Sequence, residues 1–437
     1  MRSKWLSVKG MELKQHVPFL VLLGLYLIVQ LYFLVSHPGS IYNEPERVGE
    51  GIATYGSRDA SLYAKMAWQL LHEGIYAYNE EQSNAYVTYG QPFYLAGIFQ
   101  VAEWLNTNHL MLYRLSNMVL NTLVVVLTYV IGMKLFNSRT VSFFGALLYC
   151  TYIAPYHYFR AALTEIPSLF LFMLTIFIFI LALEKKTYRY HILFGLVASL
   201  LLMFRATPAP ILLFAWGIML VRTGFKESVK IGFIWCVGPL VLMTPWVVRN
   251  FLMFGEAYLF SSHAGSPLLL GTRPFFLEGE AEVVQQAKAL GLSLEDYGKQ
   301  RIAEGFSTDF ILYFSWFTVG KTMWLFMTTQ LMPDGLGPYI NDFSKTVFEF
   351  FKWHNVFTAA SGLLFAFLFR KHRPLTYLSI VLLIYIFFSN IFLAIPRYGF
   401  IVYPIVCLIA AYGWVYIYRS AKKSIKYHKN PQHPVSS

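Results

Sequence analysis

Two acidic residues stand where a carboxylate could act as a general base. Asp59 lies in SRDASLYAKMAWQLLHEG, just past the first long apolar run, and Glu165 lies in FRAALTEIP at the edge of a later one. A carboxylate at a water–membrane boundary can take the proton from an attacking hydroxyl or amine. Asp59 could instead be an acid at a helix start, where it complements the helix dipole or caps the first turn. Glu165 could be solvated or paired with Arg160, although acids near bilayer depth are costly and tend to face an interior cavity.

A set of cations stands at the edges of apolar segments, on the side opposite to the basic loops. The set comprises Arg205 in FRATPAP, Arg249 in TPWVVRN, Lys321 in VGKTMW and Arg397 in IPRYGFIVYP. Snorkelling explains one such cation. Several at one depth indicate a bound anion, and a phosphate or pyrophosphate head group needs Arg or Lys contacts of this kind.

Motifs for other chemistries are absent from the sequence. It has no HExxH, Walker loop, GxGxxG or GxSxG string. Cys150, Cys236 and Cys407 lie in apolar runs without CxxC or Cys/His spacing, which excludes a disulfide framework and a structural zinc site. Without a nucleotide motif, we expect the leaving group to come from a lipid-borne substrate.

The composition is that of a membrane protein. Of 437 residues, 57% are hydrophobic and 13% are charged, whereas soluble domains carry about 25% charged residues. The net charge of +12 comes from short basic clusters between apolar runs, as in cytoplasmic loops. Anionic lipid head groups, not nucleic acid, are therefore its expected counter-charge.

The elements expected to position these residues are helices. We predict an all-α polytopic membrane protein with about ten transmembrane helices of about 20 residues each. The first is an uncleaved signal anchor, since no cleavage site follows it before His37. The predicted spans are 17–36, 112–134, 140–157, 166–183, 190–204, 208–222, 229–248, 353–370, 375–394 and 399–418.

Basic clusters near 134–139, 185–189, 222–230, 370–373 and 419–429 predict that both termini are cytoplasmic. The alternation is consistent only if 311–331, which contains Lys321 and precedes Asp334 and Pro338, is an interfacial helix that does not cross. The predicted divisions are a cytoplasmic N-terminus with the first span (1–36), an outer loop with the candidate acid (37–110), a transmembrane bundle (111–248), a second outer segment (249–352), C-terminal spans (353–418) and a basic tail (419–437).

Two amphipathic surface helices are expected in the first outer loop. One covers 59–73 and stops at Gly74, and the other follows Pro92.

Motifs in order along nearly the whole chain resemble those of GT-C membrane glycosyltransferases, of the protein O-mannosyltransferase and aminoarabinose transferase-like group. They are the acid that begins an amphipathic helix after Arg58, YGQPFYLAG, the edge from Arg160 to Glu165, TPWVVRNFLMFG and PRYGFIVYP. Relatives often carry a Lys or a second Pro where this chain has Gly90 and Gln91.

The resemblance implies an inverting transfer of a hexosyl or pentosyl group from a polyprenyl-phosphate donor to a lipid, glycan or protein acceptor outside the cytoplasm. It makes Asp59 the catalytic base and Glu165 a second acid. The phosphate contacts then fall to Arg58, Arg249, Lys321 and Arg397, because the YGQPFYLAG string departs from the pattern. The expected substrate pocket comprises Tyr63, Tyr89, Gln91, Tyr94, Arg160, Trp246, Asn250 and Tyr398.

Some relatives bind a divalent metal near the acids. We predict no cofactor, because only Asp59, Glu165 and His157 are candidate ligands, and a divalent metal stays open as the alternative. The expected location is the bacterial cytoplasmic membrane, with the active site facing outside.

The alternatives are a transporter or flippase for a polyprenyl-linked lipid and an oligosaccharide ligase. A transporter predicts broken or charged helices at mid-membrane, often in repeats, whereas this chain places its ionisable residues at the outer edge. The ligase shares the lipid-linked donor, and only the large outer segment after the first span favours the simpler transferase.

Overall fold

The computed structural model describes residues 13–36, 48–49, 52–262, 265–326, 344–369 and 372–429. All regular elements within these ranges are helices, so the all-α prediction is confirmed for the described part of the chain.

Each predicted span corresponds to helical structure. The helices are α1 (Val17–Ser36), α5 (His109–Phe136), α6 (Arg139–Cys150), α8 (Glu165–Lys185), α9 (Tyr188–Phe204), α10 (Ala209–Thr223), α11 (Phe225–Trp235), α12 (Val237–Leu242), α13 (Thr244–Phe254), α20 (Lys345–Leu368), α21 (Arg373–Ile391) and α23 (Tyr403–Lys429). Among the described residues, 5 helices are long and apolar enough to cross a membrane, or 6 if one bent pair counts as a span. The chain is thus a multi-pass membrane protein, and the higher figure of about ten spans stays a prediction.

Three of the predicted segments differ from straight spans. Segment 140–157 is interrupted, because α6 ends at Cys150 and the short α7 (Ala154–Tyr158) follows. Segment 229–248 runs through α11 and α12 into α13, with a bend of 50°. Pro245 lies in the first turn of α13, where a residue without an N–H breaks the helical hydrogen-bond ladder. Segment 399–418 starts earlier, with α22 (Pro396–Gly399) and the single turn η4 (Phe400–Val402) leading into α23.

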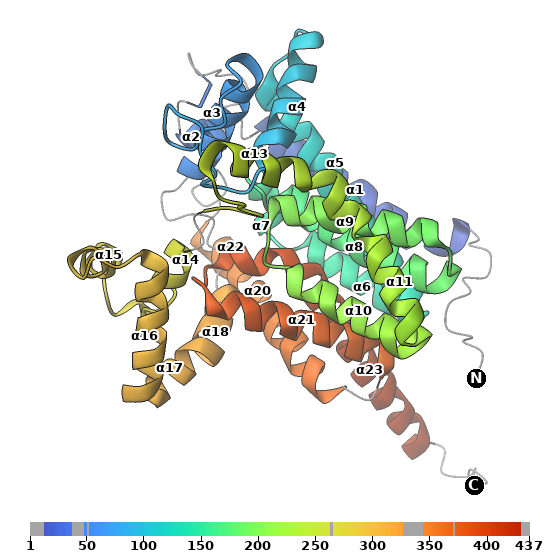
Figure 1. Cartoon of the computed structure of the whole chain (residues 1–437). Helices are drawn as coiled ribbons and strands as arrows, with labels where there is room; N and C mark the ends of the chain where they lie inside the picture. The colour runs from blue at the N-terminus through green and yellow to red at the C-terminus, as the bar shows by residue number, and fades with distance from the viewer. Residues whose placement is uncertain are drawn as a thin grey trace.

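The long helices form one bundle (Figure 1). In it α8 packs against α5 and α9, and α23 packs against α6 and α20. The shared core is apolar and aromatic, with Tyr149, Phe172 and Tyr403 among its fully buried side chains.

The two helices predicted in the first outer loop are present, and their place on the membrane surface stays a prediction. After the short α2 (Ile52–Tyr55), α3 covers Arg58–His72 and is followed by Gly74 in the left-handed region (φ +68), as the sequence predicted. The other, α4 (Gly90–Trp104), begins two residues before Pro92 and packs on α9. A Cβ on Gly90 would lie 2.7 Å from the carbonyl carbon of Met203, so this close approach requires a glycine.

The described part of the second outer segment consists of helices joined by loops. It contains α14 (Gly265–Leu270), η2 (Pro274–Phe276), α15 (Glu280–Ala289), α16 (Leu294–Thr308), α17 (Phe310–Ser315), the π-helical turn η3 (Trp316–Gly320) and α18 (Lys321–Phe326). Phe310, Ile311 and Phe314 expose apolar surface, as an interfacial helix would. The remainder of segment 311–331, with Asp334 and Pro338, lies outside the described residues.

Segments that are predicted to lie on the same side of the membrane contact one another at the same end of the bundle. At one end, Arg139 contacts Gln15 before α1, and Arg419 of α23 donates to Ser138 at 3.4 Å. At the other, the Ser262 amide donates to the Ala85 carbonyl at 2.9 Å, which joins the two outer segments.

Candidate active site

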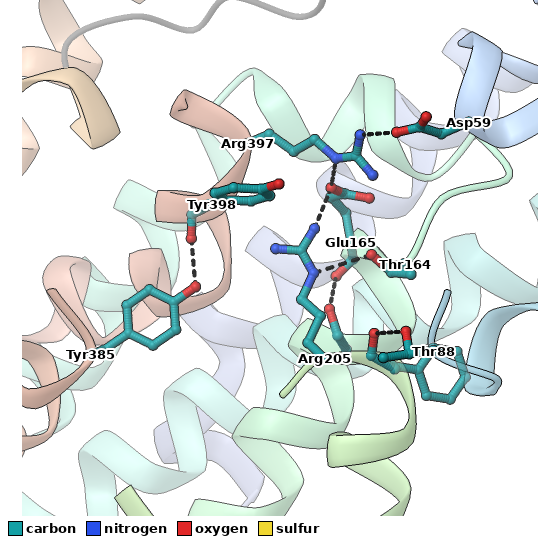
Figure 2. Close-up of polar contacts among 10 residues, drawn as sticks. Asp59, Thr88, Thr164, Glu165, Arg205, Tyr385, Arg397 and Tyr398 are labelled. Carbon is teal, nitrogen blue, oxygen red and sulfur yellow. Dashed lines mark hydrogen bonds and ion pairs between the residues drawn. The ribbon is translucent and has the colours of Figure 1, made fainter. Parts of the chain in front are cut away.

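Four elements that are distant in sequence meet at the outer-loop end of the bundle (Figure 2). They are the first turn of α3, the first turn of α8, the residue that follows α9, and α22. They bring together Asp59, Glu165, Arg205 and Arg397, which we call the acid–arginine cluster.

Asp59 lies on the accessible side of this cluster, with 42% of its side chain exposed. Its Oδ2 accepts from Nη1 of Arg397 at 2.9 Å, and its Oδ1 accepts from the Tyr78 hydroxyl at 2.9 Å. Burial and then the Asp59 carboxylate raise the pKa of Tyr78, so that phenol stays protonated and donates. The N-cap of α3 is Ser57, whose side chain accepts from the Ala60 amide at 3.1 Å. Asp59 lies in the first turn of α3, where the helix dipole favours a negative charge, so this part of the structural explanation still applies to it.

Glu165 is the buried acid, with 0% of its side chain exposed. It is the first residue of α8, where the helix dipole favours a negative charge. Its Oε1 accepts from both Nε of Arg397 and Nη2 of Arg205, and Arg205 Nε donates to Thr164 Oγ1 at 3.1 Å. The ion-pair partners are these two arginines, and the solvated alternative for Glu165 is wrong.

Both arginines keep donors that could meet a second anion. Among the described residues, Arg397 Nη2 and Arg205 Nη1 have no hydrogen-bond partner, and their side chains are 13% and 9% exposed. The Arg205 guanidinium also lies 5.5 Å from the ring centroid of Tyr398, whose carbonyl accepts from Tyr385 at 2.7 Å. Guanidinium groups with accessible N–H donors suit a phosphate.

The other predicted phosphate contacts lie elsewhere. Arg249 Nη1 donates to the Asn84 carbonyl at 3.0 Å and to Asn250 Oδ1 at 2.8 Å, and its guanidinium lies 4.8 Å from the Trp246 ring. Lys321 is buried, and its Nζ donates to two backbone carbonyls at the C-terminal end of α21. Arg58, the first residue of α3, is exposed.

The predicted pocket residues fall into three places. Tyr63 is buried beside Asp59, and burial followed by the Asp59 carboxylate raises the pKa of the Tyr63 phenol. Tyr398 adjoins Arg205. A second group packs around Arg249: the rings of Tyr89 and Trp246 stack at 4.5 Å, and the Asn250 side chain donates to the Tyr258 carbonyl. The third group, Tyr94, Arg160 and Gln91, lies within the bundle. Tyr94 donates to Ser116 and Asn117, and the Arg160 carbonyl accepts from Tyr113. Gln91 is fully buried.

Several buried polar atoms near the cluster have no hydrogen-bond partner within the described ranges. They are Oε2 of Glu165 and both ring nitrogens of His157. Buried polar groups are rarely left unpaired, so a ligand that donates and accepts hydrogen bonds would suit this region.

The sequence identifies Arg205 as one of the outer cations but does not pair it with Glu165. It gives no signal for Tyr78 or Thr164, which also contact the cluster. Tyr78 lies in the loop between α3 and α4, where no periodicity indicates its direction.

The described residues of the cluster offer no preformed set of ligands for a divalent metal. Among the described residues, no three His, Cys, Asp or Glu side chains gather in a way that could hold an ion. The space between the Asp59 and Glu165 carboxylates is occupied by the Arg397 guanidinium. No step is therefore assigned to a metal.

No protein-family model and no curated protein sequence matches the chain. Solved structures do match. The oligosaccharyltransferase of Archaeoglobus fulgidus in the apo form has a TM-score of 0.53 at 14% identity, over 97% of this chain and 53% of that one. The same enzyme tethered to an acceptor peptide gives 0.52 at 14%, over 94% and 51%. AglB of Archaeoglobus fulgidus with an inhibitory peptide and a dolichol-phosphate gives 0.51 at 15%, over 95% and 52%.

This chain therefore spans about half the length of the structures it matches. At this identity the likeness concerns the fold alone, and that fold is GT-C-like.

Proposed function

We propose that this protein is a membrane glycosyltransferase that moves a sugar from a polyprenyl-phosphate donor to an acceptor on the non-cytoplasmic side. The observation that carries the proposal is the acid–arginine cluster at the outer-loop end of a GT-C-like bundle. It combines a half-exposed carboxylate with two arginines that keep free donors, which is what proton removal and phosphate departure require.

In the proposed reaction, Asp59 takes the proton from the acceptor hydroxyl or amine. The acceptor atom bonds to the anomeric carbon as the bond from that carbon to the phosphate oxygen breaks, so the configuration inverts. The lipid phosphate leaves with the electron pair of that bond. Nη2 of Arg397 and Nη1 of Arg205 stabilise its charge, because donors fixed in advance stabilise developing negative charge most effectively.

Glu165 has a different role in this scheme. It is fully buried and binds both arginines, so it cannot meet the acceptor. We assign it as a positioning residue that keeps the two guanidinium groups together, which revises its expected part as a catalytic acid.

Lys321 is assigned a structural role, since its Nζ donates to two backbone carbonyls. Arg249 is assigned a structural role because its Nη1 donates to Asn84 and Asn250, and no contact joins it to the acid–arginine cluster among the described residues. The proposal keeps the predicted topology, with about ten crossing segments, both termini cytoplasmic and the cluster outside. The mannosyltransferase-like group remains the suggested subgroup, on the strength of its motifs alone.

A second candidate is transfer of a whole oligosaccharide. The matched structures are oligosaccharyltransferases, one with a dolichol-phosphate and another with a tethered acceptor peptide. If this chain acts likewise, the donor carries a glycan and the acceptor is a polypeptide. A flippase finds less support, because the ionisable cluster lies at one end of the bundle.

Native mass spectrometry of gently extracted protein, followed by a transfer assay, tests the proposal. We expect a co-purified polyprenyl-phosphate glycan whose sugar is released to an added acceptor, leaving polyprenyl phosphate. The size of the glycan separates the two candidates. Movement of the intact lipid across a vesicle membrane without transfer would refute both.

A further inference from the structure

A groove runs along the outside of the bundle between α8, α10 and α21. Its volume is about 360 Å³, and its walls are mainly apolar, with Phe172, Phe179, Leu212 and Leu378 among them. It extends along α10 from Pro208 to Arg222, about 21 Å at the rise of an α-helix. One leaflet of a bilayer core is about 15 Å thick, so the groove is long enough for one acyl chain.

One end of the groove is basic. Lys134, Arg222 and Arg373 line it. Lys134 is neutralised by Glu184 at 2.8 Å. Arg222 and Arg373 are exposed and have no ion-pair or hydrogen-bond partner in the described part of the chain.

This basic end lies far from the acid–arginine cluster. Glu165 begins α8, whereas Glu184 lies in the last turn of the same helix, about 30 Å away along its axis. The ring of Phe136 at the end of α5 contacts His372, the residue before Arg373. The arginines therefore mark the end opposite to the candidate active site, and a donor with its phosphate at that site could not reach them with the same phosphate.

We propose that this groove binds an anionic phospholipid, with one acyl chain between α8, α10 and α21 and the phosphate on Arg222 and Arg373. Charge complementarity selects this occupant, because two unpaired arginines at the mouth of an apolar groove match a lipid with a negative head group. The site is independent of the proposed transferase reaction.

The test measures lipid retained by the full-length protein after extraction from mixed vesicles of phosphatidylglycerol and phosphatidylcholine with identical chains. Native mass spectrometry should show preferential retention of phosphatidylglycerol. In the Arg222→Gln/Arg373→Gln protein that preference should fall by about 10-fold or more, because each cation near the membrane surface strengthens the binding of an anionic lipid.

Two further variants complete the test. The matched control, Arg189→Gln/Lys226→Gln, removes the same charge from exposed positions of the same end that do not line the groove, and should keep the preference. Ile218→Trp fills the groove one turn before Arg222 and leaves both arginines in place, so it should reduce retention of both lipids. Thermal unfolding verifies that each variant is folded.

Three results would overturn the proposal. Equal retention of the two lipids by the wild type would exclude head-group selection. An equal loss in the control pair would indicate general surface charge. A polyprenyl phosphate that is lost in Ile218→Trp but kept in the arginine variant would identify the groove as a channel for the tail of the donor.

Discussion

Asp59 and Glu165 both form an ion pair with Arg397, but their surroundings suit them to different roles. Asp59 is accessible and also accepts from Tyr78, whereas Glu165 is enclosed by two arginines. An accessible carboxylate can meet an acceptor hydroxyl. A fully buried one can only orient its neighbours.

The Asp59→Asn variant should distinguish a catalytic role of Asp59 from a structural one. Ser57 caps α3, and a partly exposed ion pair contributes only about 0–1 kcal/mol, so the variant should fold and bind donor. Transfer should fall roughly 100-fold or more, because the amide cannot accept the proton. The assay is sugar transfer by purified protein, with thermal unfolding in parallel. Near-normal transfer by a folded variant would return Asp59 to a purely structural role.

Glu165→Gln should act mainly on stability. Removing this charge leaves two buried guanidinium groups without their shared partner, and breaking a buried ion pair in this way costs about 3–5 kcal/mol. The thermal unfolding midpoint should drop clearly. The same substitution at Glu295, whose pair with Lys299 is exposed, should leave the midpoint almost unchanged. Equal midpoints for the two variants would contradict the positioning role.

Arg397 and Arg249 provide a matched comparison for donor binding. Arg397→Ala should weaken binding of a polyprenyl-phosphate sugar by roughly 10–100-fold, corresponding to a charge-assisted contact of about 1.5–3 kcal/mol. Arg249→Ala should bind donor almost normally, because its Nη1 is bonded to Asn84 and Asn250 and it makes no contact with the acid–arginine cluster among the described residues. Titration of labelled donor in detergent measures both. The reverse order of affinities would restore Arg249 as the phosphate contact.

At the scale of elements, Lys321 ties the second outer segment to the end of α21. Its Nζ donates to the carbonyls of Asn390 at 2.7 Å and Phe392 at 3.0 Å. Burial lowers the pKa of Lys321 to about 6, and the two carbonyls accept hydrogen bonds from its Nζ. The segment it fixes leads directly into Arg397.

Lys321→Met should therefore loosen this connection. Hydrogen exchange in peptides covering 390–397 should become faster, because unpaired carbonyls favour local opening. Lys299→Met, an exposed control on α16, should leave that exchange unchanged. If Lys321 binds the donor phosphate, its variant will instead lose donor affinity with unaltered exchange.

Local signals in the sequence were sufficient for many helix ends but not for the cluster. Gly74 ends α3 as predicted, because a left-handed residue after the last turn favours glycine. The contacts of the cluster join positions separated by 338 residues (Asp59 and Arg397) and 232 residues (Glu165 and Arg397). No spacing rule relates such positions, so sequence reasoning found the acids and the cations but could not pair them.

For the whole molecule, the remaining prediction is orientation in the membrane. The Arg249 side chain donates to the Asn84 carbonyl, and the Ser262 amide donates to the Ala85 carbonyl, so we expect the two outer segments to lie on one side of the bilayer. The basic loops gather at the opposite end, as the Lys134–Glu184 pair and the Arg419–Ser138 contact illustrate. Because cytoplasmic loops are enriched in Lys and Arg, that end should be cytoplasmic.

Single cysteines at positions 80 and 280, both exposed, should react with an impermeant maleimide in intact cells. A cysteine at position 226 should react only after permeabilisation. The background needs Cys236→Ser, because Cys236 is exposed while Cys150 and Cys407 are buried. Labelling of position 280 only after permeabilisation would mean that the second outer segment crosses the membrane, and the interfacial assignment of 311–331 would then be wrong. Since the cluster lies on the side of position 80, the same experiment decides which compartment supplies the acceptor.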